Sequence, residues 1–197
     1  MSEAAQTPGD NAGERDLAEV TLQSTSIYQG TILGVRKDDV RMPNGRLTVR
    51  EVVEHSDSVC MVPLDAAGNV VLVRQYRKPT ERVLLEVPAG GIEPGESPED
   101  AALRELQEEI DHTAGNLRPL SGFWLAPGWC DEFMYAFLAT DLRRSNLEQD
   151  YDEIVETVRV PLVDTLQLMA SGEIQDAKSI ASLLLAMQVV SEGGSVG

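Results

Sequence analysis

The stretch AGGIEPGESPEDAALRELQEEI, residues 89–110, decides how the rest of the chain is interpreted. Its last turns place Glu105, Glu108 and Glu109 within five residues of one another. Like charges three or four residues apart on a helix repel by about 0.2–0.5 kcal/mol per pair. Either water screens these carboxylates on a solvated face, or a bound cation holds them together, and the surrounding sequence has to decide between the two.

A helix is predicted to begin after Ser97. Ser97 is of the type that caps helix N-termini, Pro98 fits the first helical turn, and Asp100 follows three residues after the cap. At about 100° per residue, three aliphatic side chains fall on one side: Leu103, Leu106 and Ile110. The charged side chains fall within an arc of roughly 140° on the other side: Arg104, Glu105, Glu108 and Glu109.

The composition limits the possible partners. The chain has 197 residues, enough for one domain with a small appendage and a sizeable core. Its formal net charge of -17 argues against nucleic acid, because phosphate contacts need clustered Lys and Arg, and it also argues against anionic membranes. If the substrate is itself an anion, something other than the overall field must attract it, and a divalent metal ion is the obvious candidate.

The cysteines and the N-terminal residues suggest the compartment. Cys60 and Cys130 are far apart in apolar surroundings, which is typical of buried thiols in a reducing compartment. His55 and His112 form no Cys/His cluster of the zinc-binding kind. The opening residues lack a basic region followed by an apolar stretch, and no apolar run approaches the length of a membrane span. We therefore expect a cytoplasmic protein.

The remaining sequence alternates between strand and helix patterns. Strands are expected over residues 24–30, 31–40, 58–65, 69–76, 83–90, 120–127 and 133–140. Asn44-Gly45 is a strong hairpin signal, and a second hairpin is expected between 58–65 and 69–76, whose nearly all-apolar residues indicate burial on both faces. Helices are expected over residues 164–172 and 177–190. This order predicts an α/β fold in which helices cover a sheet.

Composition also divides the chain into segments. Residues 1–15 are small, polar and acidic and are expected to form a disordered tail. Residues 16–54 are expected to form an antiparallel β-arm, residues 55–191 the main domain, and residues 192–197 a flexible tail. A small isolated sheet is only marginally stable in water, so the arm is expected to pack on something.

The spacing within the acidic stretch resembles the signature of the Nudix hydrolase family. The matched positions, with five residues between the first two and seven between the next, are Gly90, Glu96, Arg104, Glu105, Leu106, Glu108 and Glu109. Average residue usage would produce such a match at one place with a probability on the order of one in ten million. The resemblance implies a Nudix-type α/β/α sandwich with a mixed sheet.

The chemistry of the matched residues agrees with this resemblance. Gly90-Gly91 allows a sharp backbone turn between strand and helix. Glu105 and Glu109 are four residues apart, so their carboxylates lie on one helix face and can share hard cations such as Mg²⁺. Arg104 and Glu108 have the same spacing and can pair, which would offset part of the repulsion.

The match departs from the family pattern at its end. The pattern closes with Gly and an aliphatic residue, where this chain has Asp111 and His112. Glycine at the first of these positions would serve as a left-handed helix cap, and Asp tolerates that conformation better than most residues. The expected metal ligands lie upstream, so altered helix termination is expected rather than lost catalysis.

The resemblance covers roughly residues 28–190 and looks like the ADP-ribose pyrophosphatase branch of the family. The segments that match this branch are 49–55, Gln75-Tyr76-Arg77, Glu86-x-Pro88-Ala89-Gly90-Gly91 and Pro127. The resemblance implies cleavage of ADP-ribose to AMP and ribose 5-phosphate with Mg²⁺, or with Mn²⁺ as the alternative. It also implies a homodimer in which the N-terminal strands, within residues 16–54, cross to the partner.

Family resemblance also implies the roles at the site. It places metal on the Ala89 carbonyl, Glu105 and Glu109, with Glu108 assisting, and it adds Arg104 and Glu109 to the catalytic residues. A further carboxylate from a later loop usually completes such sites. That loop offers three candidates, of which the last two are favoured although a solvated acidic turn is an equal alternative: Asp150, Asp152 and Glu153.

Four further residues are candidate substrate contacts: Arg50, Glu51, Arg77 and Glu132. For each of them a surface ion pair is nearly as good an explanation. Trp124 and Trp129 are expected in the core or at a dimer interface, not as platforms for adenine.

Two other functions stay open. Within the enzyme class, the substrate could be another nucleoside diphosphate sugar such as GDP-mannose, because the signature reads only the pyrophosphate. From a different class, the chain could be a Nudix-fold module that binds ADP-ribose without cleaving it. The intact carboxylate set argues against that module, because such modules often lose these residues.

Overall fold

The computed structural model describes residues 17–145, 147 and 154–193, and these form two compact units. The N-terminal unit comprises the described residues up to His55 together with Ala126–Asp131. The main unit comprises Ser56–Leu125 and the described residues from Glu132 onward. The tail expected at 1–15 lies outside the described residues, as do residues 194–197 of the tail expected at the other end.

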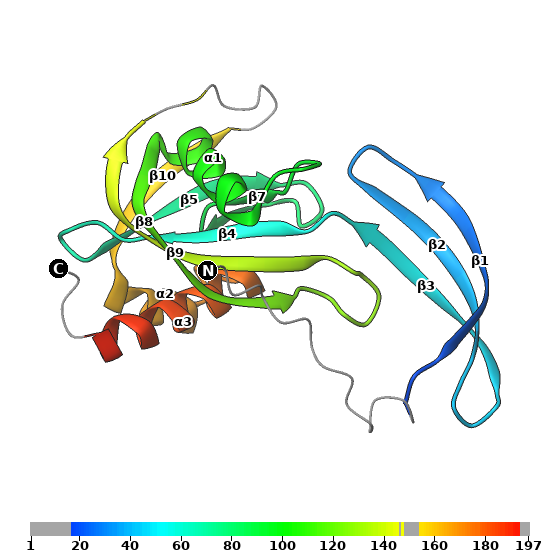
Figure 1. Ribbon diagram of the computed structural model, residues 1–197. Coiled ribbons are helices and arrows are strands. Elements are labelled where there is room, and N and C mark those ends of the chain that lie inside the picture. The colour runs from blue at the N-terminus through cyan, green and yellow to red at the C-terminus, as the bar shows by residue number, and fades with distance from the viewer. Residues whose placement is uncertain (1–16, 146, 148–153, 194–197) are drawn as a thin grey trace, which may run out of the picture. The chain divides into compact units, whose positions relative to one another are not determined.

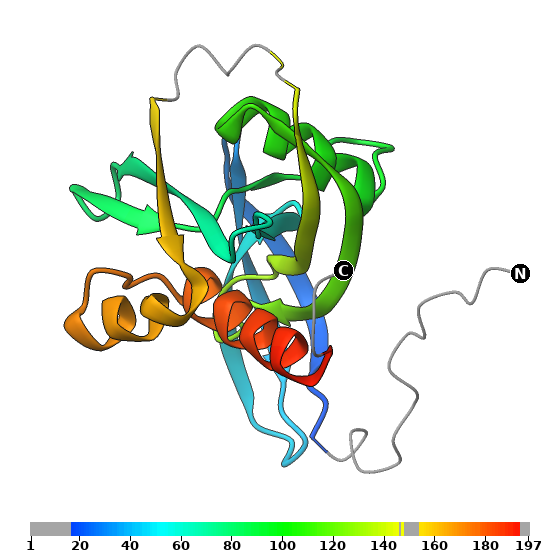
Figure 2. The ribbon, with the colours of Figure 1, turned by 90° about the vertical axis from the view of Figure 1, so that its left-hand side faces the viewer.

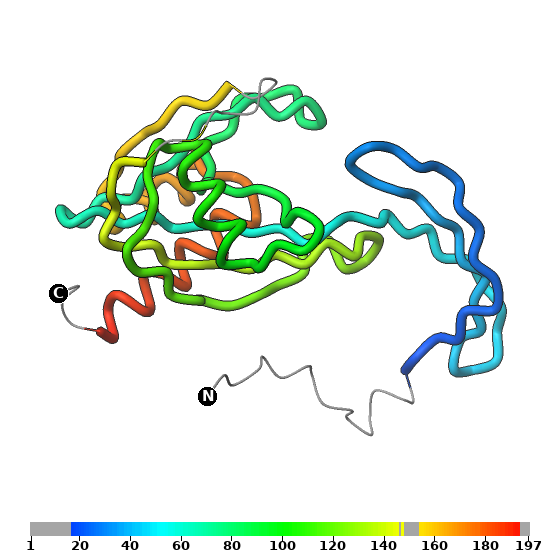
Figure 3. The backbone as a smooth tube through the Cα atoms, turned by 45° about the horizontal axis from the view of Figure 1, so that its top comes forward, coloured from blue at the N-terminus to red at the C-terminus, as the bar shows by residue number. Residues whose placement is uncertain are grey.

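Three antiparallel strands build the N-terminal unit in the order β1-β2-β3, and Figure 3 shows their path. Their bounds are β1 Val20–Gln29, β2 Leu33–Arg41 and β3 Leu47–His55. The hairpin predicted at Asn44-Gly45 is confirmed between β2 and β3. Gly45 has a φ of 82°, which glycine adopts without strain, and its amide donates to the Met42 carbonyl at 2.9 Å.

Ala126–Asp131 pairs with the end of β3. The amide of Val53 donates to the carbonyl of Trp129 at 2.7 Å, and the amide of Asp131 donates to the carbonyl of Val53 at 3.2 Å. The Asp131 carboxylate also accepts from the amide of His55 at 2.9 Å. These bonds explain why a segment expected to extend a strand to residue 127 groups with the N-terminal unit.

The main unit holds a mixed sheet and a smaller antiparallel sheet. In the first, β4 lies between β7 and β9, pairs with β9 in parallel, and β8 forms the outer edge. In the second, β5 lies between β10 and β6. The strand bounds are β4 Ser58–Pro63, β5 Asn69–Arg77, β6 Arg82–Glu86, β7 Ala89–Gly91, β8 His112–Trp124, β9 Phe133–Arg144 and β10 Val155–Pro161.

The hairpin predicted between residues 58–65 and 69–76 is wrong, because the two strands do not pair along their length. β4 and β5 are joined by a tight turn in which the Gly68 amide donates to Asp65 at 3.0 Å, but beyond the single bridge Leu64↔Val70 they enter different sheets. The expected burial on both faces is confirmed for β4, and it explains the separation. A strand that is apolar on both faces can be an inner strand of its own sheet, with a partner on each side.

The strand predicted over residues 83–90 is also divided in the structure. β6 ends at Glu86 and β7 begins at Ala89, and the two strands belong to different sheets. Pro88 stands at the break, where its missing N–H cannot join a ladder. The Pro88 carbonyl instead accepts from the Met61 amide at 2.9 Å. This short connection carries the chain from one sheet of the main unit to the other.

The helices of the main unit occupy the predicted segments. Their bounds are α1 Pro98–Ile110, the 3-10 turn η1 Leu162–Asp164, α2 Thr165–Ser171 and α3 Ala177–Gly193. The cap on α1 is confirmed, because the Ser97 hydroxyl accepts from the Asp100 amide at 3.1 Å. Asp111 adopts the left-handed conformation expected of it, with a φ of 57°. In the part of the chain that the structure describes, no helix is long and apolar enough to cross a membrane.

Alternation along the strands divides the core into two apolar clusters. On β4, Val59 and Met61 pack with Leu106 of α1, whereas Cys60 and Val62 pack with side chains of α3. The side chains of β5 and β9 alternate in the same way. Accordingly α1 covers one face of the strands while α2 and α3 cover the other, as Figures 1 and 2 show. The predicted α/β/α sandwich with a mixed sheet is confirmed.

Candidate active site

The site is built where β7 meets the middle of α1. Gly90 lies directly against Glu105: a Cβ placed on Gly90 would be 1.9 Å from Glu105 Oε1. Both Gly90 and Gly91 lie in strand β7, so the sharp turn expected from this glycine pair is wrong. Glycine is required at position 90 because the carboxylate occupies the space of a side chain.

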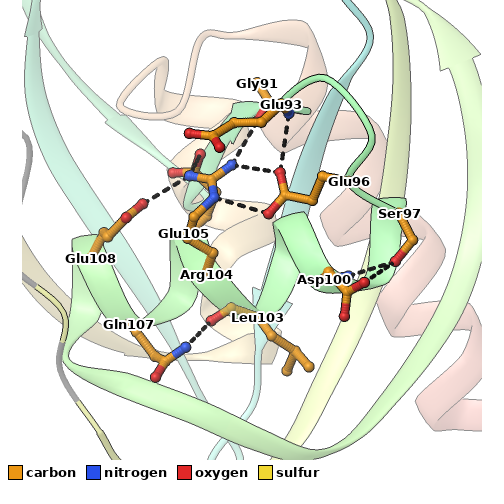
Figure 4. A network of polar contacts seen from close by, with 10 residues as sticks. All are labelled: Gly91, Glu93, Glu96, Ser97, Asp100, Leu103, Arg104, Glu105, Gln107 and Glu108. Carbon is orange, nitrogen blue, oxygen red and sulfur yellow. Dashed lines mark hydrogen bonds and ion pairs between the residues drawn. The ribbon is translucent and has the colours of Figure 1, made fainter.

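Arg104 gathers the acidic groups around this point, as Figure 4 shows. Its Nε and Nη2 donate to the two carboxylate oxygens of Glu96, each at 3.0 Å. Its Nη1 donates to Glu105 at 2.7 Å and to Glu108 at 2.9 Å, which confirms the predicted pair with Glu108. Nη2 also donates to the Gly91 carbonyl at 2.8 Å. One guanidinium therefore ties the loop, the strand and the helix together.

These contacts explain how the clustered carboxylates are tolerated. The hydrogen bonds from Arg104 hold the pKa of the Glu96 carboxyl below its ordinary value. In turn, hydrogen bonding to Glu96 is the main cause that raises the pKa of Arg104 above its ordinary value. Glu96 also accepts from the amide of Glu93 at 3.0 Å, so it fixes the loop that leads into the helix. The guanidinium thus offsets part of the repulsion among its neighbours.

Glu105 and Glu109 do not lie on a solvated face. Their exposed fractions are 8% and 4%, and the Ala89 amide donates to Glu109 Oε2 at 3.0 Å. Ionised carboxylates are costly to bury unless hydrogen bonds or cations compensate them. The solvated-face explanation therefore fails for these two residues. Leu103, which was predicted on the buried side, is only half-buried, because Ala101 and Ala102 fill that side instead.

The donor set suits a hard divalent cation. Among the described residues, no three Asp, Glu, His or Cys side chains converge as a ready-made metal site. The bonds from Arg104 and from Ala89 engage oxygens of Glu105, Glu108 and Glu109. A carboxylate offers about four lone-pair positions, so one that accepts a hydrogen bond can also ligate a metal. Oxygen ligands are those that Mg²⁺ selects, and the buried pair at the β7–α1 junction therefore fits such an ion.

The remaining predicted residues of the main unit fall at two other places. Arg77 donates to both carboxylate oxygens of Glu86, at 3.1 and 2.9 Å, which ties its guanidinium to the end of β6. Glu132, just before β9, accepts from the Ser58 hydroxyl at 2.8 Å. The three loop candidates lie outside the described residues: Asp150, Asp152 and Glu153.

Two predicted substrate contacts belong to the N-terminal unit. Arg50 pairs with Glu19 and donates to the Val49 carbonyl at 3.1 Å. Glu51 lines a cavity of about 480 Å³ within this unit, whose wall also includes Ile27 and Trp129. Trp129 is 58% exposed, which rules out the core for this residue, while the dimer interface expected as the alternative stays a prediction.

Trp124 is also exposed, at 53%, although it stacks edge-to-face on Phe133 with ring centroids 4.9 Å apart. The core is therefore ruled out for Trp124 too, and its expected place at a dimer interface stays a prediction.

The sequence reasoning missed the residues that hold Glu86. This carboxylate is 1% exposed, and Lys178 and Arg77 both contact it. Burial alone would raise the pKa of Glu86, but hydrogen bonds from Arg77 and the charge of Lys178 outweigh burial and lower it. The sequence did carry a signal, which is the single carboxylate within the apolar run VLLEV. A charged side chain is rarely buried unless it is paired, so this glutamate predicts a cationic partner.

Two family models match consecutive parts of this chain. Residues 54–183 match the NUDIX domain model, and residues 19–53 match the model of the nucleoside diphosphate sugar hydrolase N-terminal domain. The chain is 40% identical over 167 residues to an ADP-ribose pyrophosphatase of Bacillus subtilis (strain 168), covering 84% of this chain and 90% of that protein. Over the same shares it is 34% identical to a methanol dehydrogenase activator of Bacillus methanolicus.

A solved structure supports the same assignment. The crystal structure of an ADP compounds hydrolase superposes with a TM-score of 0.83 at 29% identity, covering 90% of this chain and 97% of that one. The domain match spans well over half of the chain and includes α1, β7 and the Arg104 cluster. The chain therefore belongs to the Nudix hydrolase family.

Proposed function

We propose that the protein hydrolyses the pyrophosphate of ADP-ribose, or of a related nucleoside diphosphate sugar, in a reaction that depends on Mg²⁺ or Mn²⁺. The observation that carries this proposal is the burial of Glu105 and Glu109 at the β7–α1 junction, where Arg104 bonds Glu105 and the Ala89 amide bonds Glu109. The match of residues 19–53 to a nucleoside diphosphate sugar hydrolase N-terminal domain supports this substrate class, as does the likeness to an ADP-ribose pyrophosphatase.

The proposed metal ligands are Glu105, Glu109 and the Ala89 carbonyl, with Glu108 assisting. A bound divalent cation supplies charge neutralisation for the pyrophosphate and lowers the pKa of the attacking water. Arg104 orients Glu105 and Glu108 through its hydrogen bonds. The Ala89 amide fixes the direction of the Glu109 carboxylate. Both devices hold the carboxylates in place before the substrate arrives, which is how positioning lowers a barrier.

The reaction is a single hydrolytic displacement. The oxygen of water forms a bond to one phosphorus, the bond from that phosphorus to the bridging oxygen breaks, and AMP and ribose 5-phosphate leave. A carboxylate must take the proton from the attacking water. We assign this base to Asp152 or Glu153, which lie outside the described residues. Arg50, Glu51, Arg77 and Glu132 remain the proposed substrate contacts.

A substrate panel tests the proposed specificity. Purified protein is incubated with ADP-ribose, GDP-mannose and other nucleoside diphosphate sugars, and products are scored by phosphate release after phosphatase coupling. ADP-ribose is expected to give the highest kcat/KM. A higher kcat/KM for GDP-mannose would mean that the substrate is GDP-mannose and not ADP-ribose, within the same class of nucleoside diphosphate sugars. Tight binding of ADP-ribose without turnover would instead identify a non-catalytic binding module.

Addition of Mg²⁺ is expected to raise the melting temperature at neutral pH. A ligand at ten times its Kd stabilises the native state by about 1.4 kcal/mol. For a chain of this size that corresponds to roughly 3–6 °C. The measurement is thermal unfolding in millimolar MgCl₂, with NaCl of equal ionic strength as the control. An equal rise in both salts would indicate general screening of the acidic surface and would contradict a specific metal site.

We also propose that the N-terminal strands mediate a homodimer. Every residue of β1 is exposed, and a three-stranded sheet alone is only marginally stable in water. Exposed apolar surface of this extent on one unit favours a protein partner. The large apolar side chains that the described part of this unit exposes are Leu17, Val20, Leu22, Ile27, Tyr28, Ile32, Leu47, Val49 and Trp129.

Light scattering is expected to show a dimer, and Ile27→Asp is expected to shift it toward monomer. Ile27 is 62% exposed in the N-terminal unit, so a charge there would be buried on association. Val163→Asp is the matched control, because Val163 is similarly exposed, at 73%, in the main unit. A fully active monomeric wild type would contradict the proposal.

The cytoplasm remains the proposed compartment. Both cysteines are free thiols, as expected where disulfides do not form. Burial raises the pKa of the Cys60 thiol to about 12, so this residue stays protonated and unreactive at neutral pH.

A further inference from the structure

The connection between the two sheets of the main unit, Glu86–Gly91, is held from both helix layers. We call these residues the 86–91 segment. On the side of α1, the Ala89 amide donates to Glu109 at 3.0 Å and the Gly91 carbonyl accepts from Arg104 at 2.8 Å. The packing of Gly90 against Glu105 adds a steric constraint on the same side. The C-terminal half of the segment is therefore part of the candidate active site.

The N-terminal half of the segment is held by the first turn of α3. Lys178 contacts the buried Glu86 carboxylate, and its ammonium also donates to Asp176 at 2.9 Å. The Ser179 hydroxyl accepts from the Val87 amide at 2.8 Å, and both residues are fully buried. A buried backbone N–H needs such an acceptor, because leaving it unpaired is costly.

Asp176 fixes the orientation of this turn. Its Oδ2 accepts from the Ser179 amide at 3.1 Å, as a helix cap does, and from Lys178. Its Oδ1 is buried and has no hydrogen-bond partner among the described residues. The position of the Asp176 carboxylate is therefore set by its hydrogen bonds to Lys178 and to the Ser179 amide, both of which use Oδ2.

We propose that Lys178 and Ser179 are positioning residues that set the 86–91 segment against Glu105 and Glu109. Neither residue touches the reacting atoms. They fix Glu86 and Val87, and the next residues along the chain are Pro88 and the Ala89 amide that orients Glu109. The inference rests on the proposed hydrolysis for its kinetic consequences, whereas its structural consequence, a rigid segment before any metal binds, does not depend on the substrate.

The two cations at Glu86 have different structural roles. Arg77 already donates to both oxygens of this carboxylate from β5, so charge neutralisation alone does not require Lys178. Lys178 reaches the same carboxylate from α3 and so couples the helix to the end of β6. Without it, Glu86 would stay paired to β5, and α3 would hold the segment through the Ser179 hydroxyl and the apolar packing around Val87.

Three variants and one control test this proposal. Lys178→Met removes the charge, Lys178→Arg keeps it, and Ser179→Ala removes only the acceptor of the Val87 amide. Lys78→Met is the matched control, because the Lys78 side chain is 78% exposed and pairs with Glu81 at the surface. The readouts are amide hydrogen exchange of the metal-free protein over residues 86–91, calorimetric affinity for Mg²⁺, and kcat and KM with ADP-ribose.

Lys178→Met is expected to lower kcat and Mg²⁺ affinity by about 10–100-fold, the range seen when an outer-shell support of a metal site is removed. KM is expected to change little, because the segment acts on chemistry rather than on uniform substrate binding. Exchange at the Val87 and Ala89 amides is expected to accelerate in the metal-free protein. Lys178→Arg is expected to restore most of each property, and Lys78→Met to leave all of them unchanged.

Each outcome decides the proposal. A folded Lys178→Met with wild-type exchange, Mg²⁺ affinity and kcat overturns it. If that variant does not fold, Ser179→Ala decides in its place, with faster exchange at Val87 and Ala89 and about a tenfold lower kcat expected. If the wild type turns over no nucleoside diphosphate sugar, the proposed function fails. Amide hydrogen exchange and the affinity for Mg²⁺ then still decide whether α3 positions the 86–91 segment.

Discussion

Glu109→Gln is expected to lower kcat for ADP-ribose by about two to four orders of magnitude while leaving the fold intact. Glutamine has the same shape, and its amide oxygen can still accept from the Ala89 amide that now donates to Glu109 at 3.0 Å. The substitution therefore keeps the size and position of the side chain but removes its negative charge and one of its two oxygen ligands. Steady-state kinetics at saturating Mg²⁺ measures the loss, and circular dichroism checks the fold.

Glu99→Gln is the control for this substitution. Glu99 lies in the first turn of the same helix, is exposed, and is outside the Arg104 cluster. Its replacement makes the same change in net charge and is expected to leave kcat unchanged. Near-normal turnover by Glu109→Gln at saturating Mg²⁺ would remove Glu109 from the catalytic site.

Gly90→Ala is expected to lower activity about 100-fold, the scale of loss that a displacement of about 1 Å at a catalytic group can cause. The added Cβ would lie 1.9 Å from Glu105 Oε1, closer than real contacts allow, so the carboxylate has to move. Backbone strain is not the cause, because the φ of Gly90 is not positive. The measurement is kcat together with the Mg²⁺ concentration for half-maximal rate, and both are expected to worsen.

The neighbouring glycine provides the matched control. Among the described residues, the one atom within 4 Å of a Cβ on Gly91 would be the Ser56 hydroxyl oxygen, at the ordinary van der Waals distance of 3.9 Å. Gly91→Ala is therefore expected to keep most of the activity. Equal losses in the two variants would show that the close approach of Glu105 to residue 90 is not what the site needs.

Local chemistry made α1 and its charged cluster predictable from the sequence. The Ser97 cap, the pairing of Arg104 with Glu108 and the left-handed Asp111 all depend on residues within a few positions of one another. The Asn44-Gly45 hairpin is local in the same sense. In each case the interaction that decides the structure is visible in the spacing of the residues.

Features that depend on distant partners were not predictable in this way. Whether β4 and β5 pair with each other or with other strands depends on β9 and β10, which compete for their edges. The Glu86 carboxylate is held by Lys178, 92 residues further along the chain. The close approach of Glu105 to Gly90 likewise depends on how α1 docks on the sheet, so the glycine pair alone suggested a sharp turn there.

One measurement tests most directly the claim that the carboxylates at the β7–α1 junction serve metal-dependent pyrophosphate hydrolysis. Purified protein is stripped with a chelator and incubated with ADP-ribose, Mg²⁺ is then restored, and the products are separated by chromatography at each stage. The account predicts no turnover after chelation, and equal amounts of AMP and ribose 5-phosphate once Mg²⁺ is returned. AMP released at the same rate in the presence of the chelator, or no AMP under either condition, would contradict it.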